Sequence, residues 1–133
     1  PPHQHQQIRL LLAGTLKAIV CQRLLTRHDM PGMVPALEVM INTAAVRDCI
    51  INEDKFVNIP DLVESGAQYG MQSFDQSIMS LYKQGMISIE EAMENATNRD
   101  DFDMRIKGIV GAADRWMGDN PESNRPENEK FIQ

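Results

Sequence analysis

Residues 65–81 read SGAQYGMQSFDQSIMSL and form a glycine-containing joint between two predicted helices. Glycine is the usual residue at the left-handed position that ends a helix, so Gly70 predicts the end of the first helix. Ser73 and Gln76 have the spacing of a capping box, which predicts the start of the second. We call residues 65–81 the helix joint. Nothing in its residue types indicates a nucleophile, a general base or a metal ligand, so taken alone it predicts a structural corner.

The chain before the helix joint predicts one helix followed by a β-hairpin. Apolar residues recur at helical spacing over residues 5–16, which indicates an amphipathic helix. Residues 18–25 favour a buried strand through their β-branched content, although helical periodicity could continue through them. The turn His28-Asp29-Met30-Pro31-Gly32 leads to a second strand over residues 33–41. In that strand Leu37, Val39 and Ile41 face one side, and Ala36, Glu38 and Met40 face the other.

The rest of the chain predicts short helices. Asn42 and Thr43 offer caps for a helix over residues 44–52, and Pro60 starts another after a loop over residues 53–58. The helix that begins at Ser73 is predicted to end at Gly85. Ser88 and Glu91 predict a further capping box, and Asn98 or Asp100 predicts the start of a last helix that reaches about residue 116. Residues after Met117 are almost entirely polar, which predicts a mobile tail.

Composition limits the classes of function. The 133 residues suit one domain, and a net charge of −6 without a basic cluster argues against a nucleic-acid partner. No apolar run approaches the roughly 20 residues that span a bilayer, so direct membrane insertion is not expected. The first residues, PPHQHQQ, lack the features of a signal peptide, which favours a cytoplasmic chain. Cys21 and Cys49 are widely spaced, and we expect both to be reduced and buried.

Two kinds of polar cluster invite a chemical role. His3, His5 and His28 have no metal-ligand spacing, so no metal site is predicted. Acidic residues at 90–94 and 100–103 lie at predicted helix starts, where carboxylates are favoured electrostatically, and are interpreted as solvated.

Four blocks of sequence, in order, resemble a known family. They are QIR-x-x-LAGTL-x-A-x-x-x-QRLL at residues 7–25, VPALEVMINT at 34–43, AVR at 45–47 and GAQ-x-GMQ-x-x-DQ at 66–76. This pattern resembles the pilus retraction ATPases (PilT type) of the bacterial type II/IV secretion ATPase superfamily. The segments LEVMIN, FDQ and LY-x-x-G-x-IS also resemble the accessory PilU-type paralogue.

The resemblance implies an α/β fold that is mostly α overall. Residues 1–43 are expected to be the end of a RecA-like P-loop ATPase core, with a helix and a two-stranded ribbon. Residues 44–117 are expected to form a C-terminal helical region, and residues 118–133 a flexible tail. No G-x-x-x-x-G-K-[ST] phosphate loop occurs here. That loop and the acidic motifs are expected upstream, so ATP and Mg2+ are cofactors of the parent protein and this chain alone should not hydrolyse ATP.

The resemblance also implies three groups of site residues. Gln7 and Arg9 match positions on the nucleotide side of the core or at a subunit contact, although a cation on this helix is usually just exposed. The AVRDCI segment resembles a surface helix implicated in retraction, from which the match departs at Val46, Asp48 and Cys49. The motor-coupling or partner surface is therefore expected at Ala45, Val46, Arg47, Asp48 and Glu53. The signature of the helix joint comprises Gly66, Gln68, Gly70, Met71, Gln72, Asp75 and Gln76.

The glutamines of the helix joint exceed what the caps require. Only Gln76 is needed for the capping box, so Gln68 and Gln72 predict hydrogen bonds that hold the helices against this domain's core or against the next subunit.

The function implied is the C-terminal portion of a hexameric ATPase of twitching motility, located in the cytoplasm at the inner-membrane base of the pilus. A platform protein of that membrane is the expected partner. In isolation such a segment would expose part of an interface, which predicts oligomerisation or strand exchange. Alternatives are an assembly-type pilus or type II secretion ATPase, and a free-standing helical adaptor or regulatory module without a catalytic part. The reading frame upstream of Pro1 separates the adaptor from a motor.

Overall fold

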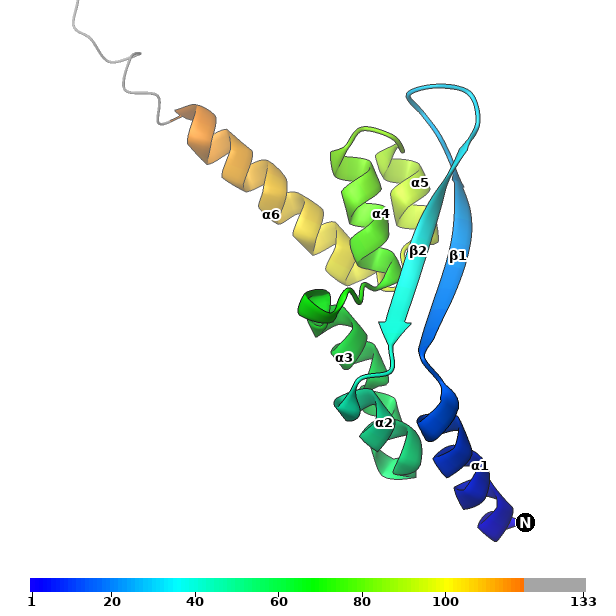
Figure 1. The fold of residues 1–133 in the computed structure, drawn as a ribbon. Coiled ribbons are helices and arrows are strands. Elements are labelled where there is room, and N and C mark those ends of the chain that lie inside the picture. Colours follow the sequence, from blue (N-terminus) through cyan, green and yellow to red (C-terminus); the bar gives the residue numbers. More distant parts are fainter. Residues whose placement is uncertain (119–133) are drawn as a thin grey trace, which may run out of the picture. The chain divides into compact units, whose positions relative to one another are not determined.

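The computed structural model describes residues 1–118, and most of its elements pack along one antiparallel ribbon (Figure 1). The chain divides into two compact units, Pro1–Arg99 and Asp100–Gln133. The elements of the first unit are α1 (Pro2–Thr15), β1 (Ala18–Thr26), β2 (Met33–Ile41), α2 (Ala44–Ile51), the 3-10 helix η1 (Glu53–Asn58), α3 (Ile59–Ser65), the 3-10 helix η2 (Ala67–Tyr69), α4 (Phe74–Lys83) and α5 (Ile89–Asn95). The mostly α fold with one two-stranded ribbon is confirmed.

The ribbon pairs β1 with β2 in a continuous register, from Ala18 opposite Ile41 to Thr26 opposite Met33. Its turn is closed by the Arg27 guanidinium, which donates to both carboxylate oxygens of Asp29 at 2.9 and 2.6 Å. Gly32 follows with a φ of 115°, a conformation that favours glycine. The predicted hairpin and its turn are thus confirmed.

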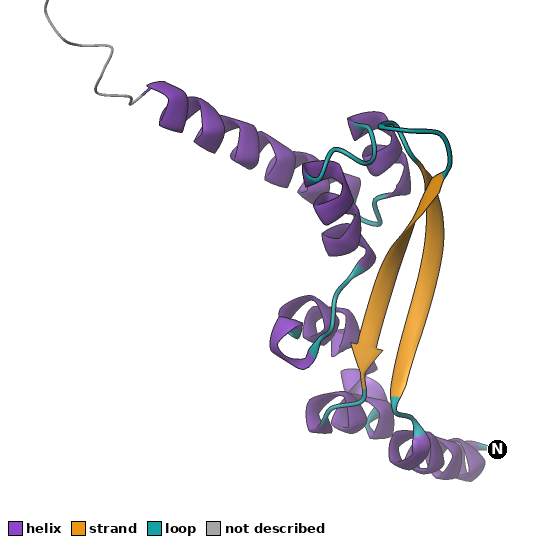
Figure 2. Ribbon diagram, turned by 45° about the horizontal axis from the view of Figure 1, so that its top comes forward, coloured by secondary structure: helices purple, strands orange, loops and turns teal. Residues whose placement is uncertain are grey.

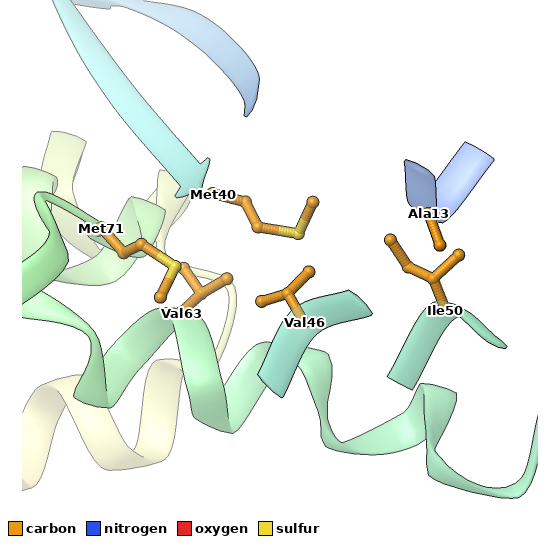
Figure 3. Packing of buried hydrophobic residues seen from close by; sticks show 6 residues of the cluster. All are labelled: Ala13, Met40, Val46, Ile50, Val63 and Met71. Carbon is orange, nitrogen blue, oxygen red and sulfur yellow. The ribbon is translucent and has the colours of Figure 1, made fainter. Parts of the chain in front are cut away.

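The main core lies between the helices at one end of the ribbon. It joins Met40 of β2 to side chains of α1, α2, α3 and the helix joint, as the side chains in Figure 3 show. Its buried members are Ala13, Met40, Val46, Ile50, Val63 and Met71. The predicted apolar face of α2 is confirmed, and Thr43 caps this helix by accepting from the Val46 amide at 3.3 Å.

The other end of the ribbon is covered by α4 and α5 (Figure 2). α4 contacts β2 and α5 contacts β1. The buried residues here include Leu25, Ala36, Phe74, Ile78, Leu81, Ile87 and Ala92. Gly85 has a φ of 73° just after α4, where the sequence predicted the helix to end.

α6 (Arg99–Gly118) belongs to the second unit from Asp100 onward and is described by itself. Asp100 and Asp101 lie in its first turn, as the sequence predicted. The Arg105 guanidinium pairs with Asp101 at 2.8 Å, and Lys107 pairs with Asp103. Phe102 and Ile106 are buried, and the predicted tail over residues 119–133 lies outside the described residues.

Several sequence predictions are wrong in detail. β1 is not a buried strand, because Leu25 is its only buried residue and Val20 is 62% exposed. Cys21 on this strand is exposed, whereas Cys49 is buried as expected. The apolar stripe of α1 is exposed as well, and only Ala13 of this helix is buried. These residues are exposed because no second layer covers them in the part of the chain that the structure describes.

Two local predictions also need correction. Residues 53–58 form the 3-10 helix η1 rather than a loop. Ser88 accepts from the Glu91 amide at 3.1 Å, but the Glu91 carboxylate does not complete a capping box. It accepts instead from the Thr26 amide of β1 at 2.7 Å, and so ties α5 to the ribbon. Among residues 1–118, no helix is both long enough and apolar enough to cross a membrane.

Candidate functional site

The helix joint is bonded to the outer edge of β2. The Gln72 amide donates to the Val39 carbonyl at 3.1 Å, and the Val39 amide donates back to the Gln72 carbonyl at 2.9 Å. The Gln72 side chain adds a third bond, from Nε2 to the Leu37 carbonyl at 2.9 Å. This side chain therefore holds the helix joint against the chain's own core, the first of the two roles expected for the surplus glutamines.

Two further side chains fasten α4 to the same edge, and neither was singled out from the sequence. Ser77 Oγ accepts from the Leu37 amide at 3.0 Å. The Glu38 carboxylate accepts from the Phe74 amide, the first of α4, at 3.2 Å. The signal for Glu38 was its position as the one charged residue of β2, since a carboxylate on a strand needs a donor nearby.

The capping box at the start of α4 is confirmed. Ser73 Oγ accepts from the Gln76 amide at 3.3 Å, while Gln76 Oε1 accepts from the Ser73 amide at 3.0 Å. The Nε2 of Gln76 donates in addition to the Glu64 carbonyl in the last turn of α3, at 2.8 Å. One side-chain amide thus fixes the start of α4 and its distance from α3.

The two signature glycines serve different purposes. Gly70 has a φ of 80° and ends η2 in the left-handed conformation predicted for it. Gly66 has an ordinary φ of −92°, but an added Cβ would lie 2.7 Å from the Leu62 carbonyl oxygen and 2.4 Å from Met71 Cε. The helix joint needs glycine here because the buried Met71 packs directly against the backbone.

Asp75 receives two backbone amides from a distant segment. Its carboxylate oxygens accept from Thr97 at 2.7 Å and from Asn98 at 3.0 Å, immediately before α6. Gln68 differs from the other signature residues, since it is exposed on η2 and its side chain makes no hydrogen bond among the described residues. Six of the seven signature residues therefore have a structural contact within the chain.

The second predicted surface lies on α2 and η1. Ala45 and Arg47 are exposed, and the Arg47 guanidinium has no hydrogen-bond or ion-pair partner within residues 1–118. Val46 is fully buried in the core, so its side chain cannot be part of the exposed surface. Its side chain instead packs in the core that α2 covers.

An ion pair ties α2 to η1. Lys55 Nζ lies 2.7 Å from the Asp48 carboxylate, to which Asn52 also donates at 2.8 Å. The hydrogen bond from Lys55 lowers the pKa of Asp48, and the same bond raises the pKa of Lys55. Both groups are exposed, so the pair orients η1 and adds little to stability.

Arg9 is engaged within the chain. Its guanidinium donates to the Ile50 carbonyl at the end of α2 at 3.1 Å, and lies 3.8 Å from the Glu53 carboxylate. The guanidinium carbon also lies 5.8 Å from the centre of the Phe56 ring. The structure thus brings two predicted site residues together, Arg9 and Glu53, whereas Gln7 is exposed.

Within residues 1–118, no group of three or more His, Cys, Asp and Glu side chains is arranged to hold a metal ion.

Comparison with known proteins gives these contacts a context. No protein-family model matches the chain. A twitching motility protein of Neisseria gonorrhoeae is 38% identical over 98 residues, which are 74% of this chain and 26% of that protein. The type IV pilus ATPase PilU of Pseudomonas aeruginosa is 35% identical over 107 residues, 80% of this chain and 28% of that protein. A crystal structure of the pilus retraction motor PilT with bound ADP matches with a TM-score of 0.63 and 33% identity.

The chain is a PilT-type C-terminal region of the secretion ATPase superfamily. The structural match to PilT covers 76% of this chain and 27% of that motor. The chain thus spans about a quarter of the length of the relatives it matches. The resemblance inferred from four sequence blocks is confirmed.

Proposed function

We propose that this PilT-type region is the C-terminal portion of a hexameric ATPase that retracts type IV pili. ATP hydrolysis, with Mg2+, belongs to the parent protein's upstream core. Residues 1–43 complete that core, and residues 44–117 couple its movement to pilus disassembly at the cytoplasmic base of the machine. A platform protein of the inner membrane is the proposed partner. The 33–38% identity to a twitching motility protein, PilU and PilT supports this assignment.

The observation that carries the proposal is the way the helix joint is bonded. Gln72, Ser77 and Glu38 connect it to the edge of β2, and β2 belongs to the segment that resembles the ATPase core. A displacement of this strand must therefore act on α4 directly. Such contacts suit packing and coupling rather than chemistry.

The test compares two glutamines of the same signature in the full-length protein. Gln72→Ala removes the bond to the Leu37 carbonyl, which is worth roughly 1 kcal/mol, whereas Gln68→Ala removes no hydrogen bond among the described residues. We expect Gln72→Ala to reduce pilus retraction measurably while nucleotide binding stays unchanged. Gln68→Ala serves as the matched control for loss of a glutamine on this segment. Equal loss of retraction and nucleotide binding in Gln72→Ala would show that the helix joint has only a structural role.

Deletion of the full-length gene tests the function itself. Cells without it should still assemble pili but should lose twitching, and the wild-type gene should restore it. Cells that lose assembled pili instead would indicate an assembly-type ATPase, the alternative function.

We further propose that α2 and η1 present the partner surface, through the exposed Arg47 and its neighbours Ala45, Asp48 and Glu53. Arg47→Ala should weaken retraction without changing the melting temperature, because the guanidinium has no partner in the described part of the chain. A loss of melting temperature would show that Arg47 acts inside the protein.

Gln7 and Arg9 are proposed to act on the nucleotide side or at a subunit contact. The bond from Arg9 to the Ile50 carbonyl supports an indirect form of this role, in which Arg9 links α1 to α2. Arg9→Ala in the full-length enzyme should lower ATP turnover, and unchanged turnover would remove the nucleotide-side role.

A further inference from the structure

We propose that Asp75 is a positioning residue, which fastens residues 97–98 to the helix joint and so extends the coupling from β2 to the end of the first unit. This inference rests on the proposed motor function and names a residue through which that function acts. The observation behind it is that both carboxylate oxygens of Asp75 are used by the consecutive amides of Thr97 and Asn98, at 2.7 and 3.0 Å.

The simpler role of Asp75 does not account for this geometry. An acidic residue in the first turn of a helix is stabilised by the helix dipole wherever its side chain points. Here the amides of Ser73, Phe74 and Gln76 at the start of α4 already have acceptors, in Gln76, Glu38 and Ser73 respectively. The Asp75 carboxylate is thus available for amides that lie 22 and 23 residues further along the chain.

Those two amides belong to the segment between α5 and α6. Ala96 closes α5 by donating to the Ala92 carbonyl at 2.9 Å, and α6 begins only at Arg99. Thr97 and Asn98 lie between the helices, so their N–H groups have no helical acceptor before them. Charge-assisted hydrogen bonds from a carboxylate are stronger than neutral ones, and two on one side chain fix both position and direction.

Gln72 lies just before the start of α4, and Asp75 lies in the first turn of this helix. Gln72 is bonded to Leu37 and Val39 of β2, and the capping box between Ser73 and Gln76 makes the intervening turn rigid. Hydrogen bonds of residues 72–76, joined by their backbone, thus connect the edge of β2 to residues 97–98. Networks of hydrogen bonds and rigid elements of this kind carry coupling between distant sites in proteins.

The first experiment measures hydrogen exchange in the 133-residue chain. Asp75→Ala should speed exchange of the Thr97 and Asn98 amides by about ten-fold or more, while the Ala96 amide, bonded within α5, keeps its rate. Asp75→Asn retains one accepting oxygen and should release only one of the two amides. The matched control is Glu90→Gln, which removes an exposed carboxylate from the first turn of α5. Unchanged exchange at both amides in Asp75→Ala would overturn the proposal.

The second experiment separates this inference from the proposed function. Full-length wild-type protein and both Asp75 variants are assayed for ATP turnover and for pilus retraction. We expect Asp75→Ala to keep at least about half of the ATP turnover and to lose several-fold in retraction, with Asp75→Asn intermediate. Full retraction in Asp75→Ala would refute the coupling role while leaving the motor function standing. A wild-type protein that does not retract pili would refute the motor function, whatever the hydrogen exchange shows.

Discussion

The helix joint shows how a single atom decides whether a residue can be replaced. Gly66 and Gly70 are four positions apart and look alike in the sequence, yet one is required by close packing and the other by backbone conformation. The sequence predicted only the second reason. A left-handed residue at a helix end is a local feature, whereas the approach of Met71 to Gly66 depends on how the helix joint folds back.

Alanine at the two glycines should therefore destabilise the chain for different reasons. We expect Gly66→Ala to lower the free energy of unfolding by about 1–3 kcal/mol through overpacking. Gly70→Ala should cost about 1–2 kcal/mol in backbone strain, and Gly70→Asn less, because asparagine tolerates the left-handed region. Chemical denaturation of the purified chain measures both.

The control for this comparison is Gly14→Ala in α1, where an added Cβ meets no atom within 4 Å. It should be neutral or slightly stabilising. If Gly66→Ala were as stable as wild type, or if Gly70→Asn were worse than Gly70→Ala, the two explanations would be wrong.

At the scale of elements, the sequence was most successful where helices begin and end. Thr43, Ser73 and Gly85 lie at the predicted boundaries, since caps and left-handed stops depend on residues within one turn. It was least successful for bonds between elements. The contacts of Glu38 with α4 and of Glu91 with β1 join positions 36 and 65 residues apart, which no local pattern encodes.

The attachment of η1 to α2 should depend on pH at both extremes. The lowered pKa of Asp48 means that its contribution is complete above the ordinary carboxyl range, and is lost as the pH falls through the folded-state pKa. The raised pKa of Lys55 means that its contribution is complete below the ordinary lysine range, and is lost as the pH rises through the folded-state pKa. We expect the amide signals of η1 to be constant near neutral pH and to shift below and above that window.

Nuclear magnetic resonance of the amides, recorded as a function of pH, measures this effect. Asp48→Asn should abolish the acid transition in η1, whereas the control Asp54→Asn should preserve it, because Asp54 is an exposed neighbour without a described partner. An acid transition that persists in Asp48→Asn would assign it to another group.

At the scale of the whole molecule, apolar side chains of β1 and α1 are exposed in the part of the chain that the structure describes. Val20 and Leu24 of β1 are 62% and 55% exposed, and Ile8 and Leu11 of α1 are 61% and 68% exposed. The sequence indicated apolar patterns for both elements, which is why it predicted burial. Burial depends on a covering layer, and periodicity in one segment cannot show whether that layer is present.

We expect the isolated chain to self-associate through this surface. Its sedimentation coefficient should rise with concentration, and Leu24→Lys should reduce the rise, because a charge on an exposed strand opposes pairing. Val57→Lys is the matched control, since Val57 is 76% exposed on η1, away from the ribbon. A strictly monomeric profile at all concentrations would contradict the prediction.

The bonds along β2 have a last consequence, for the direction in which the ribbon can grow. On its outer edge Pro35 has no N–H to offer, and the backbone groups of Leu37 and Val39 are taken by Gln72 and Ser77. The helix joint therefore blocks strand pairing at this edge, and β2 is a terminal strand. Any larger sheet that includes this ribbon must therefore add its further strands next to β1.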